Sequence, residues 1–282
     1  MLIGRIKITA GPLLGGRTYA EVHLDEDNRP RQYLPMTDPF QQDAGAFNAL
    51  TDPVPAATAT LLAPCVPRVV LGMAHNTGPA DRLLPPQAFH KSPHSVIDPG
   101  RPIELEPGHD SVDAEAEIAV VIGTPARNLT PDNALGAVFG YTIGNDVTDR
   151  AAQASDSRWT EAKSRDTYTP LGPWIRTDLD PADLRIQLGD NDAMGPEAST
   201  AGLARGIIEV LVYLTSIMTL YPGDVILTGA VGPSHRLRPG AVSRILVPGI
   251  GVLANPVIEV GRGSGQGQAH TSLAGGLGSI DF

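Results

Sequence analysis

Cysteine is nearly absent from this chain of 282 residues, since Cys65 is its only one. An internal disulfide is therefore excluded, and the composition fits the reducing environment of the cytoplasm, where we expect the protein to act. Pro64 and Pro67 flank Cys65, and no base partner is evident in the sequence around it. We therefore interpret the thiol as a packing residue in a linker rather than as a nucleophile.

Basic side chains are scarce relative to acidic ones. The chain has 21 lysines and arginines against 31 aspartates and glutamates, a formal net charge of −10 and a pI of about 5.1. This balance argues against nucleic acid or an anionic membrane as a partner. No apolar run is long enough for a transmembrane helix. The opening sequence MLIGRIKITAG lacks the apolar core of a signal peptide and is expected to form a strand.

Several common catalytic signatures are also missing: the G-x-S-x-G elbow, the H-E-x-x-H motif and clustered cysteines. What the chain offers instead is acidic residues in apolar surroundings. Glu115 and Glu117 open a run of alanine and β-branched residues that ends at Gly123 and predicts a strand. Alternate residues of a strand share a face, so the two carboxylates project together. They would repel each other without a cation between them, and such oxygen ligands suit magnesium, calcium or manganese.

A third carboxylate, Asp146, follows after a predicted helix. Thr130 is a suitable N-cap for that helix and Pro131 a suitable first residue. A strand–helix–strand unit of this length can return Asp146 to the side of Glu115 and Glu117. The apolar residues at helical spacing are Leu135, Val138 and Phe139.

Longer motifs surround these carboxylates. The segment DAEAEIAVVIG is followed by GYTIGNDVTDRAAQ, KSRDTYTPLGP and LYPGDVILTG. In this order they resemble the catalytic domain of the fumarylacetoacetate hydrolase family, over about residues 66–258. The resemblance implies a mixed, β-rich α/β fold in which mixed β-sheets roll around a metal site with flanking helices. It also implies a Mg²⁺ or Mn²⁺ cofactor, with Ca²⁺ as a further candidate, bound by Glu115, Glu117 and Asp146.

The same resemblance implies roles for other residues. Lys163 would set a positive charge against a developing oxyanion or the carboxylate of the substrate. Arg150 and Gln153, which follow Asp146 at helix-turn spacing, would orient the carboxylate of an acid substrate. Further substrate-binding positions are Lys91 and Gly229.

One catalytic element of the family is missing. The family motif G-x-N-Y-x-x-H-x-x-E supplies a His and a Glu that activate the attacking water, but the corresponding positions here are Gly78 and Asp81. A second departure is Ala230, where the family has a threonine that contacts substrate. His75 stands at the tyrosine position and is the candidate replacement base. It belongs to a Gly- and Pro-rich loop, residues 73–95, that we expect to act as a lid.

The chain divides into three segments of different character. Residues 1–65 have short apolar alternations broken by turn residues, which predicts a small β-rich N-terminal domain. Residues 66–260 would form the catalytic domain, and residues 261–282 are a Gly- and Ser-rich segment expected to be a flexible tail. A helical stripe of apolar residues predicts a core helix within residues 200–219: Leu203, Ile207, Leu211, Leu214 and Met218.

The leading hypothesis is a divalent-metal-dependent enzyme that acts on a β-diketo or acylpyruvate-like keto acid through an enolate, with C–C bond hydrolysis first. One alternative is decarboxylation, keto–enol isomerisation or hydration of a related 2-oxo acid without the usual water activation. A second is a binding protein of the same fold that has lost catalysis, for which Gly78 and Ala230 are the only support. A homodimer is expected from the resemblance, and because an extended apolar sheet favours self-association.

Overall fold

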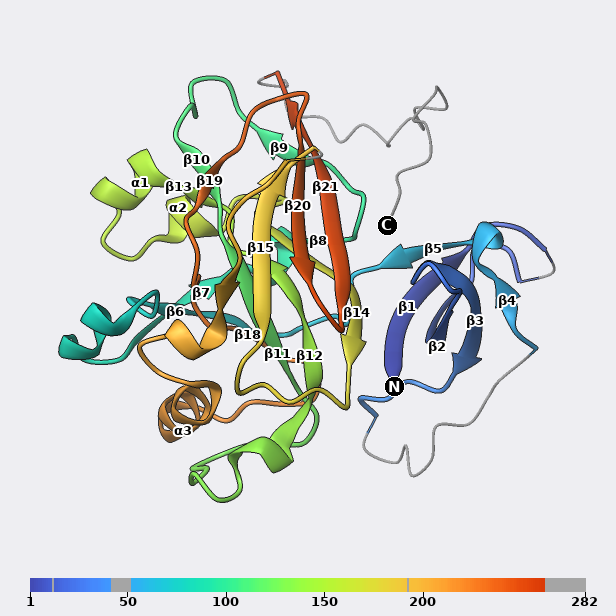
Figure 1. The fold of residues 1–282 in the computed structure, drawn as a ribbon, viewed down its shortest axis with the longest axis horizontal. Coiled ribbons are helices and arrows are strands. Elements are labelled where there is room, and N and C mark those ends of the chain that lie inside the picture. Colours follow the sequence, from blue (N-terminus) through green and yellow to red (C-terminus); the bar gives the residue numbers. More distant parts are fainter. Residues whose placement is uncertain (12, 42–51, 192, 262–282) are drawn as a thin grey trace.

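The computed structural model describes residues 1–11, 13–41, 52–191 and 193–261 (Figure 1). Of the expected tail, residues 261–282, all but Gly261 lie outside the described residues. Within the described ranges the strands form sheets of twelve, three and six strands, with short helices at their margins. The predicted mixed, β-rich α/β fold is confirmed.

The twelve-stranded sheet carries the carboxylate residues near its middle. All seven residues of β11 are buried. A strand that is covered on both faces has apolar residues in a continuous run, without the usual alternation of apolar and polar residues. This explains the sequence AVVI in β11. The strands of this half of the sheet, in spatial order, are β14 (Thr169–Arg176), β12 (Val138–Asn145), β11 (Ala116–Ile122), β18 (Val225–Leu227), β6 (Val70–Ala74) and β7 (Gln87–Lys91). The short strand β8 (Val96–Ile97) also belongs to this half and pairs with β14.

The other half of this sheet comes from the N-terminal segment, which is β-rich as expected. β1 pairs with β2 and β5, and its first residues, Leu2 and Ile3, also pair with β14. These strands lie beside the main body in Figure 1. The division of the chain at residue 65 stays a prediction. The strands are β1 (Leu2–Ile8), β2 (Arg17–Leu24), β3 (Pro30–Met36), β4 (Val54–Pro55) and β5 (Ala59–Leu62).

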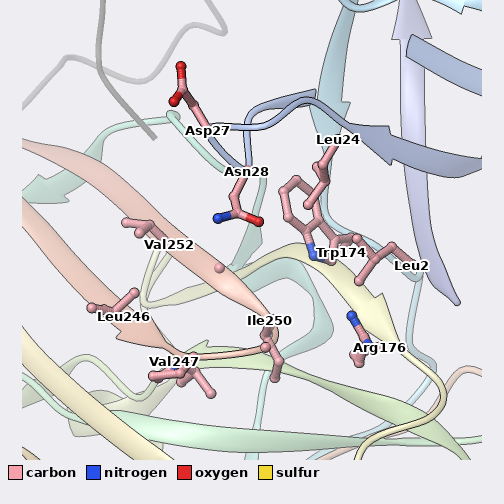
Figure 2. Close-up of a pocket in the computed structure, with 13 residues that line it drawn as sticks. Leu2, Leu24, Asp27, Asn28, Trp174, Arg176, Leu246, Val247, Ile250 and Val252 are labelled. Carbon is pink, nitrogen blue, oxygen red and sulfur yellow. The ribbon is translucent and has the colours of Figure 1, made fainter. Parts of the chain in front are cut away.

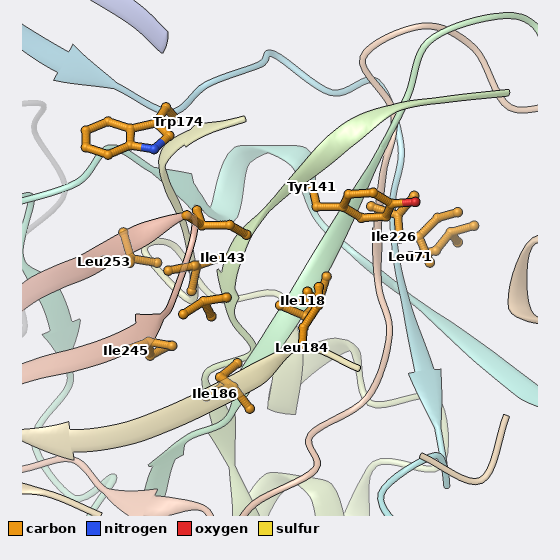
Figure 3. Close-up of a cluster of buried hydrophobic side chains, with 14 of the residues drawn as sticks. Leu71, Ile118, Tyr141, Ile143, Trp174, Leu184, Ile186, Ile226, Ile245 and Leu253 are labelled. Atoms are coloured by element: carbon orange, nitrogen blue, oxygen red, sulfur yellow. The ribbon is translucent and has the colours of Figure 1, made fainter. Parts of the chain in front are cut away.

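A six-stranded sheet packs against β11, β12 and β14 and closes the core. The apolar side chains between the sheets include Ile118 and Ile143 from one side and Ile186, Ile245 and Leu253 from the other (Figure 3). Each large aliphatic side chain buried in this way contributes about 1.5–3 kcal/mol to folding. The strands are β9 (Ile103–Leu105), β15 (Arg185–Asp190), β16 (Ala193–Met194), β17 (Ala198–Ser199), β20 (Val242–Val247) and β21 (Gly251–Glu259).

The longest described helix is α3 (Ile207–Ile217). It begins after Gly206 and buries Leu211 and Leu214, as the apolar stripe predicted, whereas Leu203 lies before it. None of the helices in the described ranges combines the length and the apolar character needed to cross a bilayer.

The prediction of a helix after Thr130 is wrong. A short 3₁₀ turn, η4 (Ala134–Ala137), forms there, and the chain then enters β12 at Val138. Val138 pairs with Ile122 of β11. Pairing with a distant strand therefore outweighs the local helical spacing, as is common for β-branched residues.

The long loop expected after residue 72 is also shorter than predicted. β6 continues to Ala74, and β7 returns antiparallel to it. Only residues 75–86, which contain the 3₁₀ helix η2 (Pro79–Leu83), form the loop itself. Lys91 therefore lies on a strand of the sheet and not on a loop.

Candidate metal centre and active site

Three carboxylates converge where β11 and β12 lie side by side. Ala116 pairs with Asn145 across the two strands, and the Asp146 N–H donates to the carbonyl of Glu115 at 2.9 Å. This pairing brings Asp146, which follows β12, beside the residues at the start of β11. One oxygen each from Glu115, Glu117 and Asp146 lies within 4.8 Å of the others. Such a group of oxygens has the spacing of a site for one divalent cation.

Three cations of the protein itself surround this cluster. Lys91 Nζ donates to Asp146 Oδ1 at 2.5 Å. Lys163 Nζ donates to Glu115 Oε2 at 2.7 Å and also to Asp146 Oδ2. Arg150 Nη2 donates to Glu115 Oε1 at 2.8 Å. The side chains of Lys91 and Lys163 are only 0% and 4% exposed, so Glu115 and Asp146 are neutralised inside the fold.

Glu117 is held differently. It is buried, and its Oε2 accepts a hydrogen bond from the backbone N–H of Gly229 at 2.5 Å rather than from a cation. Burial, and then the charges of Asp146 and Glu115, raise the pKa of the Glu117 carboxyl well above its usual value. Ionising Glu117 in this buried site beside two other carboxylates therefore costs free energy. A divalent cation among these oxygens would offset that cost. The residues present therefore fit a metal ion with oxygen ligands, such as Mg²⁺, Mn²⁺ or Ca²⁺.

The two glutamates have opposite pKa shifts although they are two residues apart. Burial alone would raise the pKa of Glu115, but the charges of Lys163 and Arg150 and their hydrogen bonds lower it to about 2. For the lysines, burial lowers the pKa of the Lys91 amine. Burial also acts to lower the pKa of Lys163, but Asp146 and Glu115 outweigh it, and the pKa is raised. Lys163 is therefore a firmly charged ammonium at the cluster.

Arg150 is fixed from several sides. It is the first residue of helix α1 (Arg150–Ser155), for which Asp149 is the N-cap. Its Nε donates to Asp113 Oδ2 at 2.9 Å and its Nη1 to Gln153 Oε1 at 3.0 Å. Gln153 thus reaches the cluster through Arg150. A small sheet of β10 (Val112–Ala114), β13 (Thr148–Asp149) and β19 (His235–Arg236) supports this arrangement.

Gly229 brings the loop after β6 close to Glu117. Its φ is +106°, and a Cβ added there would lie 2.5 Å from the carbonyl oxygen of Asn76. Asn76 is buried, and its amide donates to the carbonyls of Thr228 and Arg205 at 2.7 and 3.0 Å. Glycine is therefore required where the loop and the cluster meet.

The loop itself differs from the cluster. Gly78 precedes η2 with an extended backbone, and a Cβ added there would meet nothing within 4 Å. Asp81 accepts hydrogen bonds from the N–H and the hydroxyl of Thr77 at 2.8 and 2.9 Å, which binds its carboxylate to its own turn. His75 is exposed, has a φ of +50°, and lies 5.8 Å from Trp159 between ring centroids.

Sequence reasoning missed several residues that hold the site. Asp113 also accepts from Arg236 Nε at 2.7 Å, and His109 Nδ1 lies 2.5 Å from Asp149 Oδ2. For Asp149, the sequence offered one signal: an aspartate directly before Arg150 is a suitable N-cap for a helix that begins there. The contact of Asn76 with Gly229 joins residues far apart in the chain and left no local signal.

A separate cavity of about 450 Å³ lies between the N-terminal strands and the β20–β21 hairpin (Figure 2). Leu24, Trp174 and Ile250 are among the residues that line it. None of the predicted catalytic or metal-binding residues lines this cavity, so it is distinct from the carboxylate cluster.

The family can now be assigned by comparison with known proteins. A family model described as fumarylacetoacetate (FAA) hydrolase, C-terminal, matches residues 67–258. This chain belongs to the fumarylacetoacetate hydrolase family. It is similar to a crystal structure of 5-carboxymethyl-2-hydroxymuconate delta-isomerase from Mycobacterium smegmatis, with 35% identity and a TM-score of 0.82 over 92% of this chain and 100% of that chain.

Two further relatives are named for other reactions than the isomerase. Oxaloacetate tautomerase fahd2, mitochondrial, of Xenopus laevis is 30% identical over 250 residues, which cover 82% of this chain and 78% of that protein. The 2,4-didehydro-3-deoxy-L-rhamnonate hydrolase of a Sphingomonas strain is 31% identical over 183 residues, which cover 62% and 64%. Members of the family are enzymes that act on small molecules, and isomerase, tautomerase and hydrolase all occur among these relatives.

Proposed function

We propose that this protein is a divalent-metal-dependent enzyme that transfers a proton on a 2-oxo or β-diketo acid through an enolate, with keto–enol isomerisation as its leading reaction. The observation that carries the proposal is the environment of Glu117. This buried carboxyl lies beside Glu115 and Asp146 and has a raised pKa, while Lys163, Lys91 and Arg150 neutralise its neighbours. That arrangement favours a cation at Glu117.

The metal would be Mg²⁺ or Mn²⁺, held by Glu115, Glu117 and Asp146, and when bound it would supply Lewis-acid stabilisation of negative charge on the substrate oxygens. Side chains of the protein would bind and orient the substrate. Lys163 would hold the acid by its buried, charged ammonium, which costs little reorganisation during the reaction. Arg150, fixed by Asp113 and Gln153, would orient the substrate carboxylate.

Proton transfer is assigned to His75. It lies in the loop beside Asn76, which contacts Gly229, whose N–H in turn donates to Glu117. An exposed imidazole at this point is suited to take a proton from the carbon next to the carbonyl and to return it to the enolate oxygen or carbon. Isomerisation is preferred to hydrolysis because the loop carries Gly78 and Asp81 where a water-activating His and Glu would be, and Asp81 is bound by Thr77.

C–C bond hydrolysis remains the second candidate. Its support is the similarity to the Sphingomonas hydrolase and the retained carboxylates and Lys163. It needs an attacking water and therefore a base for that water, which His75 alone would have to supply. Decarboxylation would use the same enolate without a water. The reading as a binding protein without catalysis is weakened by the charged groups that remain around the cluster.

A product analysis tests the proposed reaction. Oxaloacetate and a panel of acylpyruvates, each with Mg²⁺ or Mn²⁺, would be followed by NMR in D₂O. Isomerisation predicts keto–enol interconversion and deuterium at C3 faster than in a Lys163→Ala control, with the carbon skeleton unchanged. Two carboxylic fragments would instead establish hydrolysis, and released carbon dioxide would establish decarboxylation. Either result would overturn the isomerase assignment.

We also propose that the protein is a homodimer, since the sequence resemblance implies one. A dimer would also cover edge strands, such as β4 or β7 at the two ends of the twelve-stranded sheet. Sedimentation equilibrium at micromolar concentration should give twice the chain mass of 29.6 kDa. A single-chain mass would contradict this proposal and leave the proposed chemistry untouched.

A further inference from the structure

Three rings form a continuous wall that starts at the carboxylate cluster. The Phe89 centroid is 4.8 Å from Lys163 Nζ, the Trp159 centroid is 5.4 Å from that of Phe89, and the His75 centroid is 5.8 Å from that of Trp159. We call Phe89, Trp159 and His75 the aromatic wall. Phe89 lies on β7, Trp159 precedes helix α2 (Thr160–Lys163), and α2 packs against β7 (Figure 1).

The exposure of the three rings increases in the order in which they contact one another, from Phe89 through Trp159 to His75. Phe89 is 8% exposed, Trp159 is half-buried and His75 is exposed. The wall therefore runs from the buried ammonium of Lys163 to the surface of the protein. An acid whose charged end lies at the cluster would extend its other end along these rings.

Both outer rings are held in place by the backbone. His75 and Trp159 have φ values of +50° and +59°, which is the left-handed region that bulky residues seldom adopt. Asn76 fixes the first through hydrogen bonds to Thr228 and Arg205. The carbonyl of Trp159 accepts from the Lys163 N–H at 3.0 Å, so the second ring is joined to the residue at the cluster. Strained conformations of this kind persist where the surrounding structure enforces them, and they concentrate at functional sites.

From this geometry we infer that Trp159 determines substrate specificity: the rings of Phe89 and Trp159 receive the part of the substrate distal to its carboxylate, and they select a flat, conjugated or aromatic group there, while His75 keeps its proposed role in proton transfer. The inference rests on the proposed function. A planar π-system can lie offset or edge-on against aromatic rings, an arrangement that a small alkyl group does not offer. The preferred class of substrate is therefore a 2,4-dioxo acid with an aryl or unsaturated group at C4.

Two acids that differ only at C4 test the inference: 2,4-dioxo-4-phenylbutanoate and 2,4-dioxopentanoate, each with Mg²⁺. Trp159 and Trp174 are the only tryptophans of the chain, so the Trp174→Phe protein reports on Trp159 alone by its fluorescence. In that protein the phenyl acid should quench the emission and bind about tenfold more tightly than the methyl acid, the upper range for an aromatic contact. Trp174 is buried away from the cluster and lines the cavity of Figure 2.

Variants at Trp159 separate specificity from folding. Trp159→Asn accepts the left-handed backbone but has no ring, and Trp159→Phe keeps a ring. Measured by calorimetry, Trp159→Asn should lose the preference for the phenyl acid and keep the Kd of the methyl acid within about twofold, while Trp159→Phe should retain part of the preference. Equal weakening of both acids in Trp159→Asn, or tight binding of both acids to the unsubstituted protein without preference, would overturn this inference alone. If neither acid binds the unsubstituted protein with Mg²⁺, the proposed function is overturned as well.

Discussion

The carboxylate cluster and the loop of residues 75–86 lie next to each other and are built in opposite ways. In the cluster the charged groups are buried and held by ion pairs, as Lys163 is between Glu115 and Asp146. In the loop His75 is exposed and Asp81 is half-buried, and the Asp81 carboxylate is bound within its own turn. The sequence resemblance implies that the cluster keeps the pattern of the fumarylacetoacetate hydrolase family and that the loop departs from it at Gly78 and Asp81.

The cluster and the loop suit two different parts of the proposed chemistry. Binding an acid and stabilising its enolate depends on fixed charges, which need a rigid, buried setting. Delivering a proton or a water depends on a group that reaches the substrate when it binds, and such groups are commonly found on loops. On the proposed function, a change in the loop would therefore change the reaction without disturbing the cluster that would hold the substrate.

Replacing His75 should abolish most turnover and leave the cluster intact. Asparagine tolerates the left-handed backbone at this position, so His75→Asn removes the imidazole with little strain. We expect kcat to fall by about 10²–10⁴-fold, the usual range for general acid–base catalysis, with metal affinity unchanged. His90→Ala, on the exposed side of β7, is the matched control. Full turnover in His75→Asn would assign the proton transfer to another group.

Replacing Lys163 should damage binding and turnover together. Lys163→Met keeps much of the buried volume but removes the charge that would face the substrate anion in every state of the reaction. We expect kcat/KM to fall by about 10²–10³-fold, as for the loss of one fixed donor to an oxyanion, and oxalate binding to weaken as well. Arg158→Ala, an exposed residue just before α2, should leave both quantities unchanged. A Lys163→Met protein that loses turnover but binds oxalate normally would place Lys163 in the proton-transfer step instead.

Restoring the family residues in the loop should add hydrolysis. Gly78 has an extended backbone, and a Cβ added there would meet nothing within 4 Å, so the backbone and the first side-chain atom accept Gly78→His. Combined with Asp81→Glu, it should raise the release of carboxylic fragments from acylpyruvates by about tenfold or more over the unsubstituted protein. Product analysis by NMR measures this release. An unchanged product ratio would mean that the loop does not decide between the two reactions.

The pH dependence of stability should reveal the titration of the Glu117 carboxyl. Its pKa is raised in the folded protein above the usual 4.5, so between these two values the native state binds a proton that the unfolded state has lost. In EDTA, stability should therefore decrease as pH rises from about 4.5 through the raised pKa, by a few degrees in Tm. Glu115, whose pKa is lowered to about 2, acts in the opposite sense, and its contribution is lost only as pH falls below 4.5.

Scanning calorimetry from pH 5 to pH 8 measures the effect. Mg²⁺ should raise Tm more at the upper end of this range, because the ionised Glu117 is the form that binds a cation. Glu117→Gln should flatten the slope seen in EDTA. A slope that is the same in Glu117→Gln would assign the titration to another group.

Much of the cluster could be predicted from the sequence because its signals are local or carried by long motifs. The alternation of Glu115 and Glu117 predicted that their carboxylates lie together, although β11 contains only Glu117 and Glu115 directly precedes it. The family motif predicted Asp146 beside them. The error after Thr130 arose because the pairing of Val138 with Ile122 is not a local property. The same holds for Asn76, whose amide contacts residues more than 120 positions away, and for the left-handed backbone of Trp159. Contacts of this kind follow from the tertiary fold and not from the spacing of residues in one segment.

We propose that Glu115, Glu117 and Asp146 bind one divalent cation, and that Glu117 is the carboxylate that no side chain of the protein neutralises. Titration calorimetry of the unsubstituted protein and of Glu117→Ala with Mg²⁺ and Mn²⁺ tests it most directly. We predict one site per chain and a loss of affinity of about 100-fold or more in Glu117→Ala, since even residues that only support metal ligands contribute 10–100-fold. Unchanged affinity in Glu117→Ala would contradict the account.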